Sequence, residues 1–291
     1  MRYAAIDIGS NAVRLLIADT NKHNDKVSFK KNSLIRVPLR LGDDAFLNQY
    51  ISDKKANELV KTMIAFKNLI DVYKVNDYMA CATSAMREAA NGQEIVKRIK
   101  EEADIDLEIV RGEREANIIY ASHIEDNIDG TKNYLYVDVG GGSTELSLFT
   151  AGKILASQSF NIGTIRMLDN QDKDETWNEL KEFIIHHVRK YKNVFGIGTG
   201  GNINKLFKLS DEKEGSPLTL TKLRVLYNHL NSYSLKDRIG ILGLNPDRAD
   251  VIIPACEIYL TVMKWADIKS IYVPSVGMVD GIIQTLIEKN G

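Results

Sequence analysis

The chain has 291 residues, of which 44% are hydrophobic and 26% charged, and its 38 basic and 39 acidic side chains leave a net charge of −1. This length suits two domains better than one, and a nearly neutral chain has no general attraction for DNA or RNA. Its apolar runs are far too short to cross a bilayer, and the first residues lack the basic and apolar regions of a secretion signal. We therefore expect a cytoplasmic protein with no nucleic-acid or membrane partner.

The first half predicts an α/β domain, because strands alternate with helices. Strands are expected over residues 3–7, 13–19, 27–37, 78–81 and 107–110. Ser52 and Asn91 are typical residues for capping the start of a helix, and each precedes a segment with apolar residues at helical spacing. A short helix is expected after Thr83 and Ser84, and a further helix is expected to begin at Gly112.

The polar segment 127–130 contains Asp129 and Gly130 and predicts a domain boundary. We expect one domain over residues 1–127 and a second over 128–291, with the last helix able to pack back onto the first domain. The second half repeats the order of elements. Its strands are expected over 134–139, 145–149, 154–160, 194–197 and 270–273, and its helices over 177–191, 220–230, 235–242, 248–265 and 278–288.

One motif occurs in both halves: apolar residues lead into Asp, and a Gly follows two positions later. It is found at Asp7 and Gly9, and again at Asp138 and Gly140. A turn of Gly and Ser between two strands leaves backbone amides unshielded, and such a concave set of amides binds phosphate. Each Asp alone could equally be a turn residue that bonds its own backbone. The duplication favours two related domains that bind a phosphate chain and its metal.

Seven segments of the chain, in this order, resemble the exopolyphosphatase/guanosine pentaphosphate phosphohydrolase (Ppx/GppA) family: residues 7–11, 40–42, 82–89, 112–116, 138–145, 163–166 and 198–201. The resemblance covers essentially the whole chain and matches the short, two-domain form of the family. It implies an α/β fold with two ribonuclease-H-like domains of the actin-like ATPase superfamily around a central cleft. It also implies magnesium-dependent removal of terminal phosphate from inorganic polyphosphate or guanosine pentaphosphate.

By this resemblance Glu115 is the catalytic base that positions a water, and Arg87 is the active-site arginine that binds a phosphoryl oxygen. The family's Gly-x-Glu-Glu-Ala pattern has Arg114 in place of its first Glu here. Taken without the family, both residues also fit purely structural roles. Glu115 suits the first turn of a solvated helix, and Arg87 could form a surface salt bridge with Glu88.

The resemblance also implies that Asp138 and Glu145 hold the metal and its water, with Asp7 as the symmetric metal contact. All of these ligands are oxygen donors, which favour Mg²⁺, with Mn²⁺ as an alternative, over Zn²⁺. The expected phosphate-binding residues are those of the glycine turns and their neighbours: Gly9, Ser10, Asn11, Arg14, Gly140, Gly141, Gly142, Ser143, Thr144, Gly200 and Gly201. The last two belong to a loop that could also be a plain strand-to-helix turn.

Two other functions remain open at the level of sequence. One is a phosphotransferase of the same superfamily, and the other is a sensor that binds polyphosphate or a nucleotide without hydrolysing it. The sequence does not choose among the phosphorylated substrates. A homodimer is the default expectation, and Cys81 and Cys256 are expected to be buried, reduced thiols.

Overall fold

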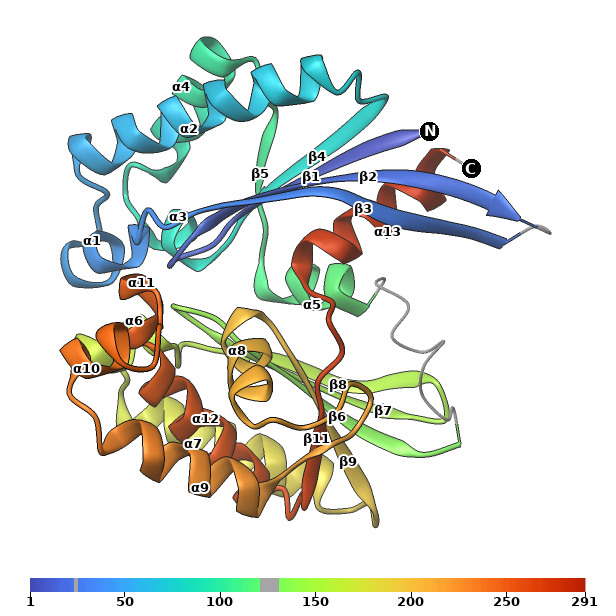
Figure 1. Ribbon diagram of the computed structural model, residues 1–291, viewed down its shortest axis with the longest axis vertical. Helices are drawn as coiled ribbons and strands as arrows, with labels where there is room; N and C mark the ends of the chain where they lie inside the picture. Colours follow the sequence, from blue (N-terminus) through green and yellow to red (C-terminus); the bar gives the residue numbers. More distant parts are fainter. Residues whose placement is uncertain (24–25, 121–130, 291) are drawn as a thin grey trace. The chain divides into compact units, whose positions relative to one another are not determined.

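The computed structural model describes residues 1–23, 26–120 and 131–290, with all their side chains except those of residues 22, 23, 26, 113 and 120. The chain divides into two compact units (Figure 1). Unit 1 comprises residues 1–123 and 276–291, and unit 2 comprises residues 124–275. The boundary expected after residue 127 lies outside the described residues.

Unit 1 is built on a five-stranded sheet with the order β3-β2-β1-β4-β5. The strands are β1 (Arg2–Ile8), β2 (Val13–His23), β3 (Lys26–Val37), β4 (Asp77–Ala82) and β5 (Leu107–Ile109). The first three form an antiparallel meander, whereas β4 and β5 run parallel to β1. The tight turn between β1 and β2 therefore lies at the same edge of the sheet as the carboxyl end of β4.

The helices of unit 1 are α1 (Leu41–Asn48), α2 (Asp53–Val72), α3 (Ser84–Glu88), α4 (Gly92–Ala103), α5 (Gly112–Tyr120) and α13 (Met278–Asn290). Helices α2 and α4 pack against each other, and α13 packs against β1, β2, β4 and α5 (Figure 1). The C-terminal helix thus returns to the unit formed by residues 1–123. Its buried residues include Ile282, Ile283 and Leu286.

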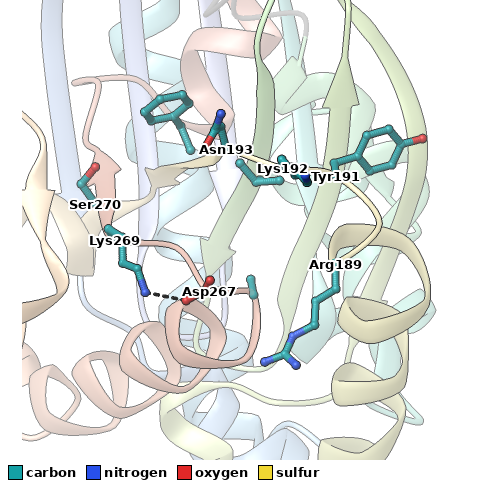
Figure 2. A pocket seen from close by; sticks show the side chains of 10 residues that line it. Arg189, Tyr191, Lys192, Asn193, Asp267, Lys269 and Ser270 are labelled. Atoms are coloured by element: carbon teal, nitrogen blue, oxygen red, sulfur yellow. Dashed lines mark hydrogen bonds and ion pairs between the residues drawn. The ribbon is translucent and has the colours of Figure 1, made fainter.

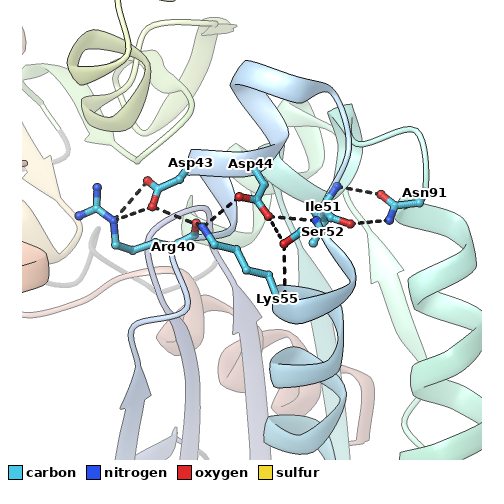
Figure 3. Close-up of polar contacts among 7 residues, drawn as sticks. All are labelled: Arg40, Asp43, Asp44, Ile51, Ser52, Lys55 and Asn91. Atoms are coloured by element: carbon cyan, nitrogen blue, oxygen red, sulfur yellow. Dashed lines mark hydrogen bonds and ion pairs between the residues drawn. The ribbon is translucent and has the colours of Figure 1, made fainter.

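The two predicted helix caps differ in outcome. The Ser52 hydroxyl accepts a hydrogen bond from the amide of Lys55, so its capping role in α2 is confirmed. Asn91 occupies the predicted N-cap position of α4, but its side chain makes no capping bond there. Its amide group instead pairs with the backbone of Ile51, accepting from the N–H at 3.0 Å and donating to the carbonyl at 2.8 Å (Figure 3).

Unit 2 has a six-stranded sheet with the order β10-β11-β9-β6-β7-β8. The strands are β6 (Asn133–Val139), β7 (Thr144–Thr150), β8 (Lys153–Phe160), β9 (Val194–Thr199), β10 (Leu218–Thr219) and β11 (Ser270–Tyr272). Strands β6, β7 and β8 form an antiparallel meander, and β9 runs parallel to β6. The arrangement of unit 1 is therefore repeated in unit 2, with β10 added at one edge.

The helical segments of unit 2 are α6 (Thr164–Leu168), α7 (Asp174–Phe183), the π-helical η2 (Ile184–Val188), α8 (Gly201–Leu209), α9 (Leu220–Asn231), α10 (Leu235–Gly240), α11 (Pro246–Ala249) and α12 (Ile252–Trp265). The prediction of one helix over 248–265 is wrong. Pro254 lies in this range, and a proline is tolerated only in the first turn of a helix. The chain therefore ends α11 first and begins α12 just before Pro254.

Each unit has an apolar interior of its own. Unit 2 is filled by side chains such as Leu135, Leu206 and Met263, all fully buried. Cys81 in unit 1 and Cys256 in unit 2 are buried and free of disulfides, as expected. Burial raises the pKa of each thiol to about 12. In the described ranges, no helix is both long and apolar enough to span a membrane.

Candidate active site

The first glycine turn joins β1 to β2 in unit 1, and two short helices hold it. The side chain of Ser10 is buried, and its hydroxyl lies 2.9 Å from the hydroxyl of Ser84 at the start of α3. The carbonyl of Ser10 accepts a hydrogen bond of 2.9 Å from the amide of Gly42 in α1. The predicted phosphate-binding residues Gly9, Ser10 and Asn11 therefore belong to a turn whose backbone is fixed from two sides.

Arg40, which precedes α1, is a further anchor of this turn. Its amide donates to the carbonyl of Asn11 at 3.0 Å. Its φ of 52° is in the left-handed region, which is uncommon for a residue other than glycine and is often found at functional sites. The guanidinium Nε donates to Asp43 Oδ2 at 3.0 Å, and the ammonium of Lys55 bonds the Arg40 carbonyl. These contacts hold Arg40 in its strained conformation.

Asp7 lies at the end of β1, directly opposite Arg14 in β2 and Cys81 in β4. Residues paired in this way project from the same face of a sheet, so these three form a row that we call the unit 1 row. The Asp7 carboxylate is buried and accepts a hydrogen bond of 2.6 Å from Arg14 Nη1. The residue predicted to contact metal is thus ion-paired with a residue predicted to bind phosphate.

Arg87 and Glu115 lie near each other in unit 1. Arg87 is in α3, and its Nη1 donates to the carbonyl of Val110 at 2.8 Å, just after β5. Glu115 is in the first turns of α5, where its Oε2 lies 4.0 Å from the same nitrogen of Arg87. The Glu115 side chain is 12% exposed and that of Arg87 is 25% exposed. The low exposure of the Glu115 carboxylate and its position beside an arginine do not fit the alternative of a solvated residue in the first turn of a helix.

The second glycine turn joins β6 to β7 in unit 2 and is fixed by α6. The amides of Thr164 and Ile165 donate to the carbonyls of Gly140 at 3.1 Å and Gly141 at 2.8 Å. Arg166 Nε donates to the carbonyl of Gly142 at 2.5 Å. Since these carbonyls all point into α6, the turn is anchored through its acceptors, as the first turn is through α1.

Gly163 allows α6 to approach the turn closely. A Cβ atom at position 163 would overlap the backbone of Gly141 and Gly142. Only glycine has room here, so the segment 163–166 is shaped to fit the second turn.

Asp138 lies at the end of β6, directly opposite Glu145 in β7 and Thr199 in β9. By the same pairing argument these residues share one face of the sheet, and we call them the unit 2 row. Glu145 is buried and accepts a hydrogen bond of 2.7 Å from the hydroxyl of Ser159 in β8. The two rows share the Asp and differ at the other two places: unit 1 has Arg14 and Cys81 where unit 2 has Glu145 and Thr199.

Gly200 and Gly201 lie beside the unit 2 row. The φ of Gly200 is 95°, and a Cβ atom there would come within 2.5 Å of Asp138 Oδ1. Gly201 begins α8, so the start of this helix is close to the Asp138 carboxylate. Beneath them the hydroxyl of the fully buried Tyr259 donates to the carbonyl of Thr199 at 2.9 Å. Burial, together with the charges of Asp138 and Glu145, holds the pKa of Tyr259 well above its usual range.

The unit 2 row fits a hard divalent cation. Mg²⁺ is commonly held by one or two carboxylates together with waters and phosphate oxygens, and Asp138 and Glu145 supply two carboxylates on one face. The Thr199 hydroxyl in the same row is fully buried and has no hydrogen-bond partner within the described residues. Those residues contain no cluster of three or more His, Cys, Asp or Glu side chains that could enclose a metal. The donor set therefore suits an ion that keeps waters or substrate oxygens among its ligands.

Thr199, Ser159 and Tyr259 were not anticipated from the sequence. Thr199 is the last residue of β9 and lies within the family segment 198–201, so its place in that segment was a usable signal. Ser159 and Tyr259 carry no local signal, because only strand register and helix packing bring them to the row.

A model described as the Ppx/GppA phosphatase family matches residues 21–290. The chain is 28% identical over 283 residues to a bifunctional 3-dehydroquinate synthase/phosphatase from Fusobacterium nucleatum, covering 86% of this chain but 41% of that protein. It is 23% identical to exopolyphosphatase 1 from Mycobacterium bovis, covering 97% of this chain and 87% of that protein.

The fold is similar to the crystal structure of an exopolyphosphatase from Cytophaga hutchinsonii, with a TM-score of 0.85 and 24% identity over 99% of this chain and 98% of that one. Each unit also has the strand order of a ribonuclease-H-like domain, three antiparallel strands followed by two parallel ones, and unit 2 adds β10 to it. The predicted α/β fold with two such domains is thereby confirmed.

Proposed function

Because the chain belongs to the Ppx/GppA phosphatase family, we propose that it hydrolyses the terminal phosphate from inorganic polyphosphate or guanosine pentaphosphate. The similarity to exopolyphosphatase 1 over nearly the whole chain supports this substrate class. Hydrolysis of a phosphoanhydride needs little covalent help from a protein. It needs a positioned water and groups that stabilise the negative charge on the phosphoryl oxygens.

Glu115 is the proposed general base. The observation that carries this assignment is its largely buried carboxylate 4.0 Å from Arg87 Nη1. In this role the carboxylate accepts a proton from the attacking water, while Arg87 binds an oxygen of the phosphoryl group that is being transferred. The bond from Arg87 to the Val110 carbonyl supports the role of Arg87, because it orients the guanidinium before substrate binds.

The glycine turns are the proposed phosphate-binding elements. Their carbonyls bond α1 and α6, which leaves the turns rigid when a phosphate approaches their amides and the hydroxyls of Ser10 and Ser143. We assign Arg14 to the same function in unit 1. Its bond to Asp7 orients the guanidinium without removing all of its donors, since an arginine has five N–H groups.

Asp138 and Glu145 are the proposed magnesium ligands. Mg²⁺ held there would supply positive charge for the phosphoryl oxygens of the substrate. We place the metal in unit 2, because Asp7 already has the positive charge of Arg14 beside it. Mn²⁺, which takes the same oxygen donors, is the alternative ion.

The activity test is phosphate release from polyphosphates of several lengths, guanosine pentaphosphate, and nucleoside di- and triphosphates, each with Mg²⁺, Mn²⁺ or a chelator. We expect metal-dependent release from at least one of the first two substrate classes. Phosphate transferred to an acceptor instead of water would identify a phosphotransferase. Saturable binding without any turnover would identify a sensor.

The assignment of Glu115 has a direct test. Glu115→Gln keeps the shape of the side chain but cannot accept the proton, so we expect phosphate release to fall by at least about two orders of magnitude. Polyphosphate binding should persist. The matched control is Glu101→Gln, which removes an exposed carboxylate from α4 and should leave the rate unchanged. Normal release by the Glu115 variant would show that another group is the base.

A further inference from the structure

A cavity of about 610 Å³ opens in unit 2 between two loops that lead into adjacent parallel strands (Figure 2). One loop, residues 189–193, precedes β9, and the other, residues 266–269, precedes β11. Strands β9 and β11 pair directly, so their starts lie side by side. The predicted phosphate turn lies at the opposite end of β6. The seven-residue length of that strand separates the two places by about 20 Å.

Hydrogen bonds within unit 2 hold the walls of this cavity. The side chain of Asn133 donates to the carbonyl of Lys192 at 3.1 Å, and the amide of Ile268 donates to the carbonyl of Met263 at 2.9 Å. Asn193 and Asp267 both adopt left-handed backbone conformations, with φ of 54° and 55°. Each loop therefore turns sharply just before its strand. These bonds and turns define the walls of the cavity.

Positive charge dominates the lining. Arg189, Lys192 and Lys269 contribute three cations, whereas Asp267 is the one carboxylate among the lining residues. Asp267 Oδ1 lies 2.5 Å from Lys269 Nζ, so this pair is neutral as a whole. The ammonium of Lys192 has no acidic partner within 4.0 Å among the residues that the structure describes. The cavity thus keeps an excess of positive charge from Arg189 and Lys192.

Contacts with helix ends give a structural role to only one of these two cations, Arg189. Arg189 Nε donates to the carbonyl of Trp265 at 2.7 Å, a common way to satisfy the last carbonyl groups of a helix such as α12. This bond uses one of the five N–H donors of Arg189. Lys192 lies beyond the end of η2, and its ammonium bonds no helix terminus among the described residues. Its charge therefore has no structural use within the described part of unit 2.

Aromatic rings add to the site. The ring of Phe195 lies in the lining, and Lys132 Nζ lies 5.5 Å from its centroid. Tyr134 and Tyr272 flank Phe195, with centroids 6.0 and 6.3 Å away. These contacts fix the ring and bring a further ammonium close to the cavity, which strengthens its attraction for an anion.

We propose that this cavity is a second anion site, which binds compounds with several consecutive phosphates. Its volume lies within the usual range of about 300–1,000 Å³ for small-molecule sites, so it has room for more than one phosphate group. The phosphates could belong to an inorganic chain or to a nucleotide, because both present the same charged oxygens to Arg189 and Lys192. The site does not depend on hydrolysis elsewhere in the chain.

The test counts binding sites on the full chain by isothermal titration calorimetry with Mg²⁺ present. The probes are imidotriphosphate and guanosine 5′-(β,γ-imido)triphosphate, whose bridging nitrogens resist cleavage of the terminal phosphate. We expect imidotriphosphate to occupy two sites. Hydrogen exchange should slow in peptides that span residues 189–195 and 266–270. Equal affinity for both probes would show that the site recognises only the phosphate groups. Weaker binding of the nucleotide would show that the site prefers inorganic phosphate chains.

Lys192→Glu should weaken the second site at least tenfold and leave the first unchanged, with Lys192→Met intermediate. The control Lys236→Glu makes the same charge change on exposed α10 and should affect neither site. A single site in the unmodified chain, or a second site unaffected by Lys192→Glu, would overturn the inference even if hydrolysis is normal. Conversely, a chain that keeps this site but releases no phosphate from any substrate would contradict the proposed function alone.

Discussion

At the scale of single residues, the two copies of the Asp motif differ in the residue that pairs with the Asp on the next strand of the hairpin. In the unit 1 row Arg14 faces Asp7 at 2.6 Å, and the two charges cancel. In the unit 2 row Glu145 faces Asp138, and like charges directly opposite each other on a sheet are unfavourable without a cation. The same backbone thus holds an ion pair in one unit and a candidate cation site in the other.

This difference is already visible in the sequence. Arg14 follows Asp7 at the same spacing as Glu145 follows Asp138, so equal hairpins place them at equal positions. The prediction of Asp7 as a metal ligand rests on the symmetry of the two Asp residues, whereas Arg14 and Glu145 already favour the second turn as the metal side. The role of Thr199 could not be predicted from the hairpin spacing. It depends on the parallel pairing of β9 with β6, two strands that are remote in sequence.

Thr199 gives a test at this scale. Thr199→Val replaces a buried hydroxyl that has no hydrogen-bond partner in the described structure, so the free energy of unfolding without metal should stay the same or rise. Phosphate release should fall at least about tenfold, and half-maximal activity should need more Mg²⁺, if the hydroxyl faces the bound ion or its water. Chemical denaturation and magnesium titration measure the two effects.

The matched variant is Thr144→Val, whose hydroxyl donates to the carbonyl of Ile162 at 2.7 Å. Losing that bond should lower the free energy of unfolding by about 1 kcal/mol. If Thr199→Val were equally destabilising, its hydroxyl would have a structural role and the comparison would count against the site.

At the scale of elements, every strand except the two-residue β10 was predicted, but the helix expected over 248–265 is divided into α11 and α12, and the short helices α1 and α6 were missed. Neither begins with a side-chain cap: Arg40 precedes α1 and Gly163 precedes α6, and neither makes a capping bond. Both are instead held by hydrogen bonds to the carbonyls of a glycine turn. Local sequence signals cannot reveal a helix that a tertiary contact stabilises, although the family segments 40–42 and 163–166 marked both places.

The contact between α13 and α5 leads to a prediction at this scale. A Cβ atom at Gly281 would overlap the carbonyl oxygen of Ile118, so the two helices approach too closely for any other residue. Glu115 lies about one turn before Ile118 in the same helix. We expect Gly281→Ala to displace α5, to lower phosphate release at least tenfold, and to reduce stability by about 1–3 kcal/mol.

Gly277→Ala is the control, because a Cβ atom there would meet nothing within 4 Å. Phosphate release and thermal unfolding, measured for both variants, separate the close approach from the general effect of adding a methyl group. An unchanged rate for Gly281→Ala would mean that the position of α5 does not control Glu115.

At the scale of the whole molecule, the two units have separate interiors, and the C-terminal helix contributes to the first. Leu286 in α13 and Leu206 in α8 are both fully buried, one in each unit. Leu286→Ala should cost about 2–5 kcal/mol and accelerate hydrogen exchange in β1, β2 and β4. Leu206→Ala should cost as much and accelerate exchange in β6 and β9. Identical exchange patterns for the two variants would show that the units unfold as one.

The return of α13 to unit 1 also sets the order in which the molecule can be completed on the ribosome. All of unit 2 is synthesised between the two segments of unit 1, so the domain that begins first is finished last. Until residues from Val276 onward emerge, the sheet of β1, β2 and β4 lacks the helix that covers it, and its apolar side chains remain open to misfolding. Glu115, whose helix packs on α13, gains its final support only at that last step.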